Sequence, residues 1–151
     1  MAYLVTGGFG CIGSYVIRDL LEAGKQVIVY DLTYDLTIPN MVLNDNQINQ
    51  ITFVGGDITD LPNILQTIKK NNIDRIIHLA SWQVPACQAN PPLALKIVSE
   101  GTVNIFEAAR IFGIERTVWA SSVAVFGSPD DYNHQQIKNE SAHFPKFIYG
   151  A

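Results

Sequence analysis

The sequence predicts an α/β fold of three αβα layers, in which helices cover both faces of a doubly wound parallel sheet. Apolar runs typical of buried strands alternate with segments of helical periodicity along the 151 residues. A glycine-rich turn at residues 7–13 joins the first strand to the first helix. Because right-handed crossovers bring the carboxyl ends of parallel strands to one edge, we expect the functional site at that edge.

Composition restricts the possible functions. A hydrophobic content of 48% with only 16% charged residues is sufficient for a buried core. The net charge of −4 argues against a nucleic-acid surface, and two cysteines are too few for a disulfide framework. No stretch approaches the roughly 20 apolar residues that cross a bilayer. We therefore expect one cytoplasmic domain over residues 1–151 that binds a small molecule, not a nucleic acid or a membrane.

The glycine-rich turn is the most informative stretch. It follows the apolar residues 3–5 and precedes a helical pattern at residues 15–21. Glycines let the backbone approach a pyrophosphate, and the N–H groups that open the helix face the phosphate charge. A second strand, residues 26–30, ends at Asp31, 18 residues beyond Gly13, where a carboxylate suits a hydrogen bond to a ribose 2′-hydroxyl. This arrangement predicts a bound dinucleotide, NAD and not NADP, since a carboxylate repels a 2′-phosphate.

The middle of the chain continues the alternation. Residues 32–50 are polar and predict a loop with at most a short turn. A third strand at residues 51–54 leads to Asp57 and Asp60, and a helix follows at residues 61–71. Either aspartate could cap that helix. We favour Asp60 as the cap and place Asp57, at the carboxyl end of the strand, near the adenine ring.

A fourth strand is predicted at residues 75–80. It brings the small residues Ala80 and Ser81 to the ligand-binding edge, where they leave room for a cofactor. His78 lies inside the apolar strand, which favours a packed, hydrogen-bonded histidine over a catalytic one. Residues 82–92 contain three prolines and predict a loop.

The last regular elements are a helix at residues 93–112, which ends at Gly113, and a fifth strand at residues 115–122. That strand delivers Ser121 and Ser122 to the same edge as the glycine-rich turn. A strand-end serine commonly bonds to backbone, and we favour that role for Ser121.

Several motifs, in the same order along the chain, resemble the extended short-chain dehydrogenase/reductase superfamily, which contains nucleotide-sugar epimerases and dehydratases. The glycine loop is TGGFGCIG at 6–13, and the motifs of the third and fourth strands are GDI at 56–58 and HLA at 78–80. GTVNIFEAAR at 101–110 is similar to the central helix, and SSVAVFG at 121–127 to the catalytic-serine segment. The resemblance covers essentially the whole chain and implies a Rossmann-type fold.

The resemblance also implies the site residues. Ser122 corresponds to the active-site serine, and Tyr149, in the closing YGA, to the tyrosine of a Tyr-x-x-x-Lys motif. Val98 stands where relatives usually carry asparagine, and Phe126 where they usually carry tyrosine. The residues expected to bind NAD are Gly7, Gly10, Cys11, Ile12, Gly13, Asp31, Asp57, Ile58, Leu79, Ala80 and Ser81.

The sequence ends two residues before the position of the motif's lysine. In the superfamily this lysine lowers the pKa of the tyrosine, and later segments supply the C-terminal strands and the substrate lobe. We therefore expect the NAD-binding portion alone, inactive as it stands, without the C-terminal substrate domain. Its apolar end, with Phe144, Phe147, Ile148 and Tyr149, is expected to promote association, with a homodimer as one form, or to remain disordered.

The parent activity implied by the resemblance is transient oxidation of a nucleotide sugar. Tyr149 would act as the base, Ser122 would hold the reacting oxygen, and NAD would accept and return a hydride. One alternative is an NAD-dependent alcohol or ketone oxidoreductase of the same superfamily, and another is a nucleotide-binding module without catalysis. No Gly-x-Ser-x-Gly elbow surrounds either serine, which excludes a serine hydrolase. Metal binding is not expected, because His78, His134 and His143 lack a zinc spacing with either cysteine.

Overall fold

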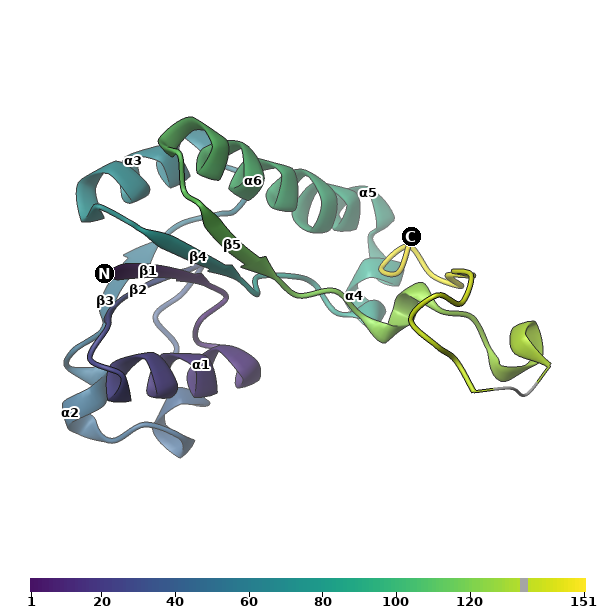
Figure 1. Cartoon of the computed structure of the whole chain (residues 1–151), viewed down its shortest axis with the longest axis horizontal. Coiled ribbons are helices and arrows are strands. Elements are labelled where there is room, and N and C mark those ends of the chain that lie inside the picture. The colour runs from purple at the N-terminus through teal and green to yellow at the C-terminus, as the bar shows by residue number, and fades with distance from the viewer. Residues whose placement is uncertain (134–135) are drawn as a thin grey trace.

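The computed structural model describes residues 1–133 and 136–151 and contains a five-stranded sheet of order β3-β2-β1-β4-β5 (Figure 1). Every neighbouring pair is parallel. The strand order changes direction between β1 and β4, which is where open α/β sheets bind ligands. The strands are β1 (Ala2–Thr6), β2 (Gln26–Asp31), β3 (Thr52–Gly55), β4 (Arg75–His78) and β5 (Arg116–Trp119).

Helices cover both faces of the sheet. Figure 1 shows α1 and α2 on one face and α3 and α6 on the other, which confirms the predicted three-layer arrangement. The helices are α1 (Cys11–Glu22), α2 (Asp45–Ile48), α3 (Leu61–Asn71), α4 (Val84–Ala89), α5 (Pro91–Ala94) and α6 (Gly101–Phe112). Shorter turns are η1 (Pro39–Met41), η3 (Val123–Val125) and η4 (Pro129–Tyr132), and η2 (Leu95–Glu100) is π-helical. Among the described residues, no helix combines the length and apolar character needed to cross a bilayer.

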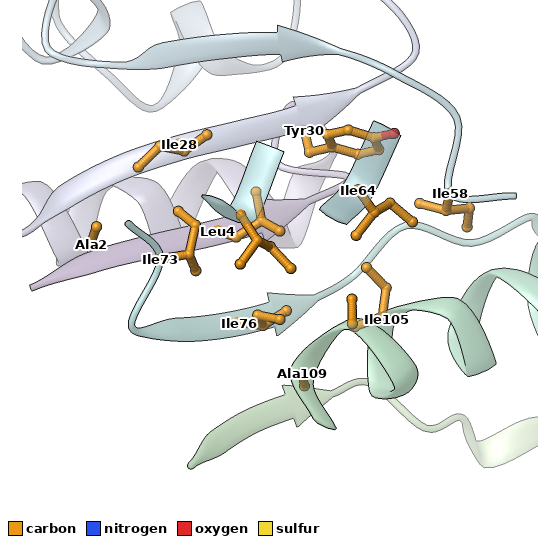
Figure 2. Packing of buried hydrophobic residues seen from close by; sticks show 12 residues of the cluster. Ala2, Leu4, Ile28, Tyr30, Ile58, Ile64, Ile73, Ile76, Ile105 and Ala109 are labelled. Atoms are coloured by element: carbon orange, nitrogen blue, oxygen red, sulfur yellow. The ribbon is translucent and has the colours of Figure 1, made fainter. Parts of the chain in front are cut away.

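Two apolar clusters hold the layers together, one on each face. Leu4 belongs to the first cluster and Val5 to the second, because successive side chains of β1 point to opposite faces. Both are fully buried, which explains why the strand is continuously apolar. Burying one such side chain contributes about 1.5–3 kcal/mol. Figure 2 shows the first cluster, which includes Leu4, Ile28, Tyr30, Ile58, Ile64, Ile76 and Ile105.

Helix α3 has the bounds that its caps predict. The Asp60 carboxylate accepts a hydrogen bond from the Asn63 N–H at 3.1 Å, which confirms its predicted capping role. At the other end Asn72 adopts a left-handed conformation, with φ of 48°. Gly113 ends α6 in the same way, as predicted, with φ of 63°.

Two sequence predictions need correction. The expected loop at residues 82–92 contains α4 and the start of α5, because its prolines occupy first-turn positions where no N–H is needed. β4 and β5 end at His78 and Trp119, so Ala80, Ser121 and Ser122 lie just beyond the strands. Residues 32–50 are mostly irregular but include η1 and α2, the latter closed by a capping box between Asn44 and Gln47.

The segment after β5 projects beyond the sheet and packs on itself (Figure 1). The Tyr132 hydroxyl donates to the Ala142 carbonyl at 2.7 Å and accepts from the Gly127 N–H at 3.1 Å. The Tyr132 ring also contacts the rings of Phe126 and Phe144. These contacts join Phe126 and Gly127 to Ala142 and Phe144 through Tyr132, while Phe144 stays 44% exposed.

Candidate functional site at the carboxyl edge of the sheet

A cleft of about 560 Å³ opens at the carboxyl ends of the strands. The glycine loop, the ends of β2, β3 and β4 and the segment after β5 all contribute to its walls. Of the residues predicted from the sequence, only Ser122 does not line it. Those that do are Gly7, Gly10, Cys11, Ile12, Gly13, Asp31, Asp57, Ile58, Leu79, Ala80, Ser81 and Tyr149.

Two glycines of the loop have no room for a side chain. Gly7 has φ of +64°, and a Cβ there would lie 2.7 Å from the backbone N of Ala80. The Gly7 N–H donates to the Tyr30 carbonyl at 3.0 Å, which fixes the loop against β2. A Cβ on Gly13 would lie 2.5 Å from the Gly8 carbonyl oxygen. Helix α1 therefore packs directly against the loop, and bare backbone faces the cleft.

The first turn of α1 is suited to an anion. Gly10 is the N-cap residue, and within this described helix no side chain caps the end and no acidic residue occupies the first turn. The N–H groups of Cys11, Ile12 and Gly13 therefore have no intrahelical acceptor, and the positive end of the helix dipole adds to them. The side chain of Cys11 is exposed at this end of the cleft. Together these groups can hold a phosphate.

The Asp31 carboxylate is tied to the glycine loop. One oxygen accepts from the Phe9 N–H at 3.3 Å and the other from the Leu32 N–H at 2.8 Å. Among the described residues that line the cleft, three are aspartates, namely Asp31, Asp35 and Asp57, and none is lysine or arginine. These carboxylates can accept hydrogen bonds from hydroxyl groups of a ligand, and their negative charge would repel a phosphate group placed beside them.

The side chain of Tyr30 supports the turn that carries Asp57. The Tyr30 hydroxyl lies 3.0 Å from the Asp57 carbonyl and 2.8 Å from Oδ1 of Asn63. Burial, with Asp60 and Asp57 nearby, raises the pKa of Tyr30, so the phenol stays a donor. The Asp57 carboxylate accepts from the Thr59 N–H at 2.8 Å, which closes the turn.

Helix α6 holds the next residue, Ile58. The Asn104 amide donates to the Ile58 carbonyl at 3.0 Å, and a Cβ on Gly101 would lie 2.6 Å from the Ile58 side chain. The sequence analysis missed Tyr30 and Asn104. An amide within the apolar stripe of a predicted helix was the available signal for Asn104.

His78 is 3% exposed and makes two side-chain hydrogen bonds. Its Nδ1 lies 2.6 Å from the Thr6 hydroxyl, and its Nε2 lies 3.2 Å from the Thr102 hydroxyl. Burial lowers the pKa of His78 to about 4, so the ring is neutral near pH 7.

Of the two serines after β5, Ser121 lines both the cleft and an adjoining pocket, whereas Ser122 lines the pocket alone. Ser121 lines the cleft together with Tyr149. The Ser122 hydroxyl accepts from the Ala124 N–H at 3.1 Å and borders an adjoining pocket of about 390 Å³, which Ser121 and His143 also line. The structure therefore places Tyr149 and Ser121 at the cleft, and Ser122 at the adjoining pocket.

The described residues contain no group of three or more His, Cys, Asp or Glu side chains that could hold a metal ion. His134, one of the histidines considered from the sequence, lies outside the described residues. Cys87 is buried, its thiol lies 3.5 Å from the Trp82 carbonyl, and burial raises the pKa of this thiol.

Comparison with known proteins identifies the family. The model of the GDP-mannose 4,6 dehydratase family matches residues 4–151. The chain belongs to this family. Family membership confirms the resemblance to the extended short-chain dehydrogenases/reductases, a group of enzymes that includes epimerases, dehydratases and dehydrogenases.

Relatives in the dehydratase family are much longer than this chain. UDP-glucose 4-epimerase of Lacticaseibacillus casei is 30% identical over 153 residues, covering 99% of this chain and 43% of that protein. A UDP-glucose 4-epimerase structure from Stenotrophomonas maltophila, solved with NAD and formylated UDP-arabinopyranose, has a TM-score of 0.85 and 26% identity over 99% of this chain and 44% of that one. L-threonine dehydrogenase of Clostridium difficile has a TM-score of 0.84 and 25% identity, covering 99% and 44% of the two chains.

Proposed function

We propose that the chain binds NAD in the cleft, as the dinucleotide-binding portion of a nucleotide-sugar epimerase or dehydratase. The observation that supports this most directly is the close contact between Gly7, Gly13 and their neighbours, which leaves bare backbone and an open helix end at the cleft. Relatives of similar fold were solved with NAD bound.

Each part of the cleft suits one part of the cofactor. The N–H groups at the start of α1 would hold the pyrophosphate, and Asp31 would accept from the adenosine ribose. Asp57 and Ile58 would border the adenine, while Leu79, Ala80 and Ser81 would form the opposite wall. The absence of lysine and arginine from the described lining favours NAD over NADP.

The reacting centre would lie at the far end of the cleft. Bound NAD supplies the hydride acceptor for oxidation of a sugar hydroxyl. We assign Tyr149 as the base that removes the hydroxyl proton and Ser122 as the serine that orients the reacting oxygen. Because Ser121 lines the cleft and Ser122 borders the adjoining pocket, separate alanine variants of the two in an active, full-length relative test this assignment.

As it stands, this chain would bind NAD without hydride transfer. A phenol of ordinary pKa, about 10, acts as a base near neutrality only if a nearby cation lowers that pKa. Lys146, three residues before Tyr149, instead pairs with Asp131 at 2.8 Å. We also propose a cytoplasmic location and self-association, as a homodimer in one form, through the exposed side chains of Phe144, Phe147 and Ile148.

A second candidate is an NAD-dependent alcohol oxidoreductase. The structural similarity to L-threonine dehydrogenase supports it. The same cleft would serve both activities, since both begin with oxidation of a secondary alcohol. The test measures NADH formation by a chain extended past Ala151. NADH formation with a simple alcohol, but not with nucleotide sugars, would favour this second activity.

Calorimetric titration with NAD and NADP tests the cofactor assignment. We expect binding of NAD with a preference of about tenfold, which corresponds to roughly 1.4 kcal/mol of charge repulsion. Asp31→Asn should reduce this preference, whereas Asp45→Asn, at an exposed position on α2, should not. Equal binding of the two cofactors by the wild-type chain would remove Asp31 from the proposed role.

A further inference from the structure

A chain of hydrogen bonds crosses the floor of the cleft from the glycine loop to η2. The Thr6 hydroxyl lies 2.6 Å from Nδ1 of His78, and Nε2 of His78 lies 3.2 Å from the Thr102 hydroxyl. The Thr102 hydroxyl donates to the Val98 carbonyl at 2.6 Å. Thr6 also meets two N–H groups, those of Leu79 and Ala80, each at 3.2 Å. The chain thus joins β1, β4, α6 and η2.

The Val98 end fixes the direction of every bond in the chain. A carbonyl only accepts, so the Thr102 hydrogen points to Val98. The Thr102 oxygen must then accept from His78, which places the ring hydrogen on Nε2. A neutral ring with that hydrogen has its lone pair on Nδ1, and Nδ1 therefore accepts from Thr6.

The Thr6 end agrees with this tautomer. The Ala80 N–H donates to the Thr6 hydroxyl oxygen at 3.2 Å, and the Leu79 N–H is shared between that oxygen at 3.2 Å and the Thr6 carbonyl at 3.1 Å. The hydroxyl oxygen of Thr6 thus faces two donors, while its hydrogen points to Nδ1 of His78. The Val98 end therefore fixes the tautomer, and the contacts of Thr6 support it.

The two ends of the chain hold backbone groups from two different parts of the cleft lining. The Thr6 end grips Leu79 and Ala80, whose backbone is in contact with Gly7. At the other end, Thr102 holds the Val98 carbonyl of the π-helical η2, a geometry frequent at functional sites. Ala80, Gly7 and Val98 all line the cleft.

We propose that Thr102 is a positioning residue for the cofactor, which acts through His78 and Thr6 to hold the Gly7 and Ala80 backbones at the spacing that the dinucleotide requires. The inference rests on the proposed function. Loss of the Thr102 hydroxyl leaves the Nε2 hydrogen of His78 without an acceptor, so the hydrogen moves to Nδ1. Thr6 then faces three donors with two lone pairs, so the Leu79 N–H is left with the Thr6 carbonyl as its one acceptor and the Thr6 hydroxyl no longer holds Leu79 and Ala80 together.

The test combines NAD calorimetry with 15N NMR of the histidine rings in this chain, the His78 signals being assigned with His78→Gln. For the wild-type chain we expect hydrogen on Nε2 and a bare Nδ1. Thr102→Val should move the hydrogen to Nδ1 and weaken NAD binding about tenfold, the effect of one lost buried hydrogen bond. Thr102→Ser keeps the hydroxyl and should retain both the tautomer and the affinity.

Thr117→Val is the matched control. It makes the same substitution at a buried hydroxyl that has no hydrogen-bond partner in the described part of the chain, so it should leave the affinity and the His78 signals unchanged. If Thr102→Val does not fold, Thr102→Ala removes the same hydroxyl, and the tautomer of the wild-type chain remains decisive. If the wild-type His78 ring carries its hydrogen on Nδ1, or if Thr102→Val binds NAD as tightly as wild type, the inference is wrong but the proposed function is unaffected. A wild-type chain that does not bind NAD overturns the proposed function with it.

Discussion

The Tyr30 hydroxyl lies 3.0 Å from the Asp57 carbonyl, so a fully buried residue of β2 supports the turn that follows β3 at the cleft. Gly56 is the reason that the ring fits, since a Cβ there would lie 2.3 Å from the ring. The pair connects the packing of the core to the position of Asp57.

Tyr30→Phe removes this support without changing the shape of the core. We expect a loss of stability of about 1 kcal/mol and NAD binding weakened about fivefold, because the one hydroxyl hydrogen available to the Asp57 carbonyl and to Oδ1 of Asn63 is lost. Chemical denaturation and calorimetry measure the two effects. Tyr15→Phe, at an exposed position on α1, is the control and should change neither. Full NAD affinity in a destabilised Tyr30→Phe would show that the turn does not depend on this hydroxyl.

Two glycines with nearly equal φ allow the cost of a left-handed backbone to be measured apart from the cost of a steric clash. Gly24 has φ of +66° and no atom within 4 Å of a Cβ, whereas Gly7 has φ of +64° and meets the Ala80 backbone. Gly24→Ala should cost only the left-handed conformation, about 1–2 kcal/mol. Gly7→Ala should cost clearly more and abolish NAD binding. Similar unfolding free energies for the two variants in urea would contradict the close contact.

His78 makes stability depend on pH in the acid range. Its pKa falls from an ordinary 6.5 to about 4 in the folded chain, so below pH 6.5 the unfolded chain binds a proton that the folded chain does not. Stability should therefore fall as the pH is lowered from 6.5 towards 4, by up to roughly 3 kcal/mol from this residue. Denaturation of wild type and His78→Gln at several pH values isolates the effect, which should be missing in the variant. His143→Gln, at an exposed position, should follow the wild-type curve.

Thr117→Val should stabilise the chain. The Thr117 hydroxyl is buried on β5 without a hydrogen-bond partner among the described residues, and valine keeps the β-branched shape. Removing a buried, unsatisfied hydroxyl should raise the free energy of unfolding by about 1 kcal/mol. A melting temperature lower than that of wild type would indicate that the hydroxyl has a partner in solution.

Local signals were sufficient for much of the fold. The bounds of α3 follow from the Asp60 cap and the apolar spacing of its residues, and β2 ends at Asp31 as the sequence indicates. The loop prediction for residues 82–92 was wrong, because proline, which interrupts a helix, is also common in its first turn.

The site was predictable only where one segment determines it. The spacing of the glycine loop and Asp31 predicts that they bind NAD, and the structure places both at the cleft, while the binding itself stays a prediction. Tyr30, Asn104 and Thr102 act through contacts with residues far along the chain, which spacing does not reveal. Which of Ser121 and Ser122 faces the cleft depends on where β5 stops, and strand ends are not marked by periodicity.

The bond between Thr6 and His78 joins residues 72 positions apart, and Thr102 lies a further 24 positions on. The glycine loop therefore gains these supports only after β4 and α6 have been synthesised and have paired with β1. Until then a nascent chain has the glycine-rich sequence without the shape that we propose binds a phosphate. Cofactor capture during synthesis would thus mark the moment at which the segment from β1 to α6 has assembled.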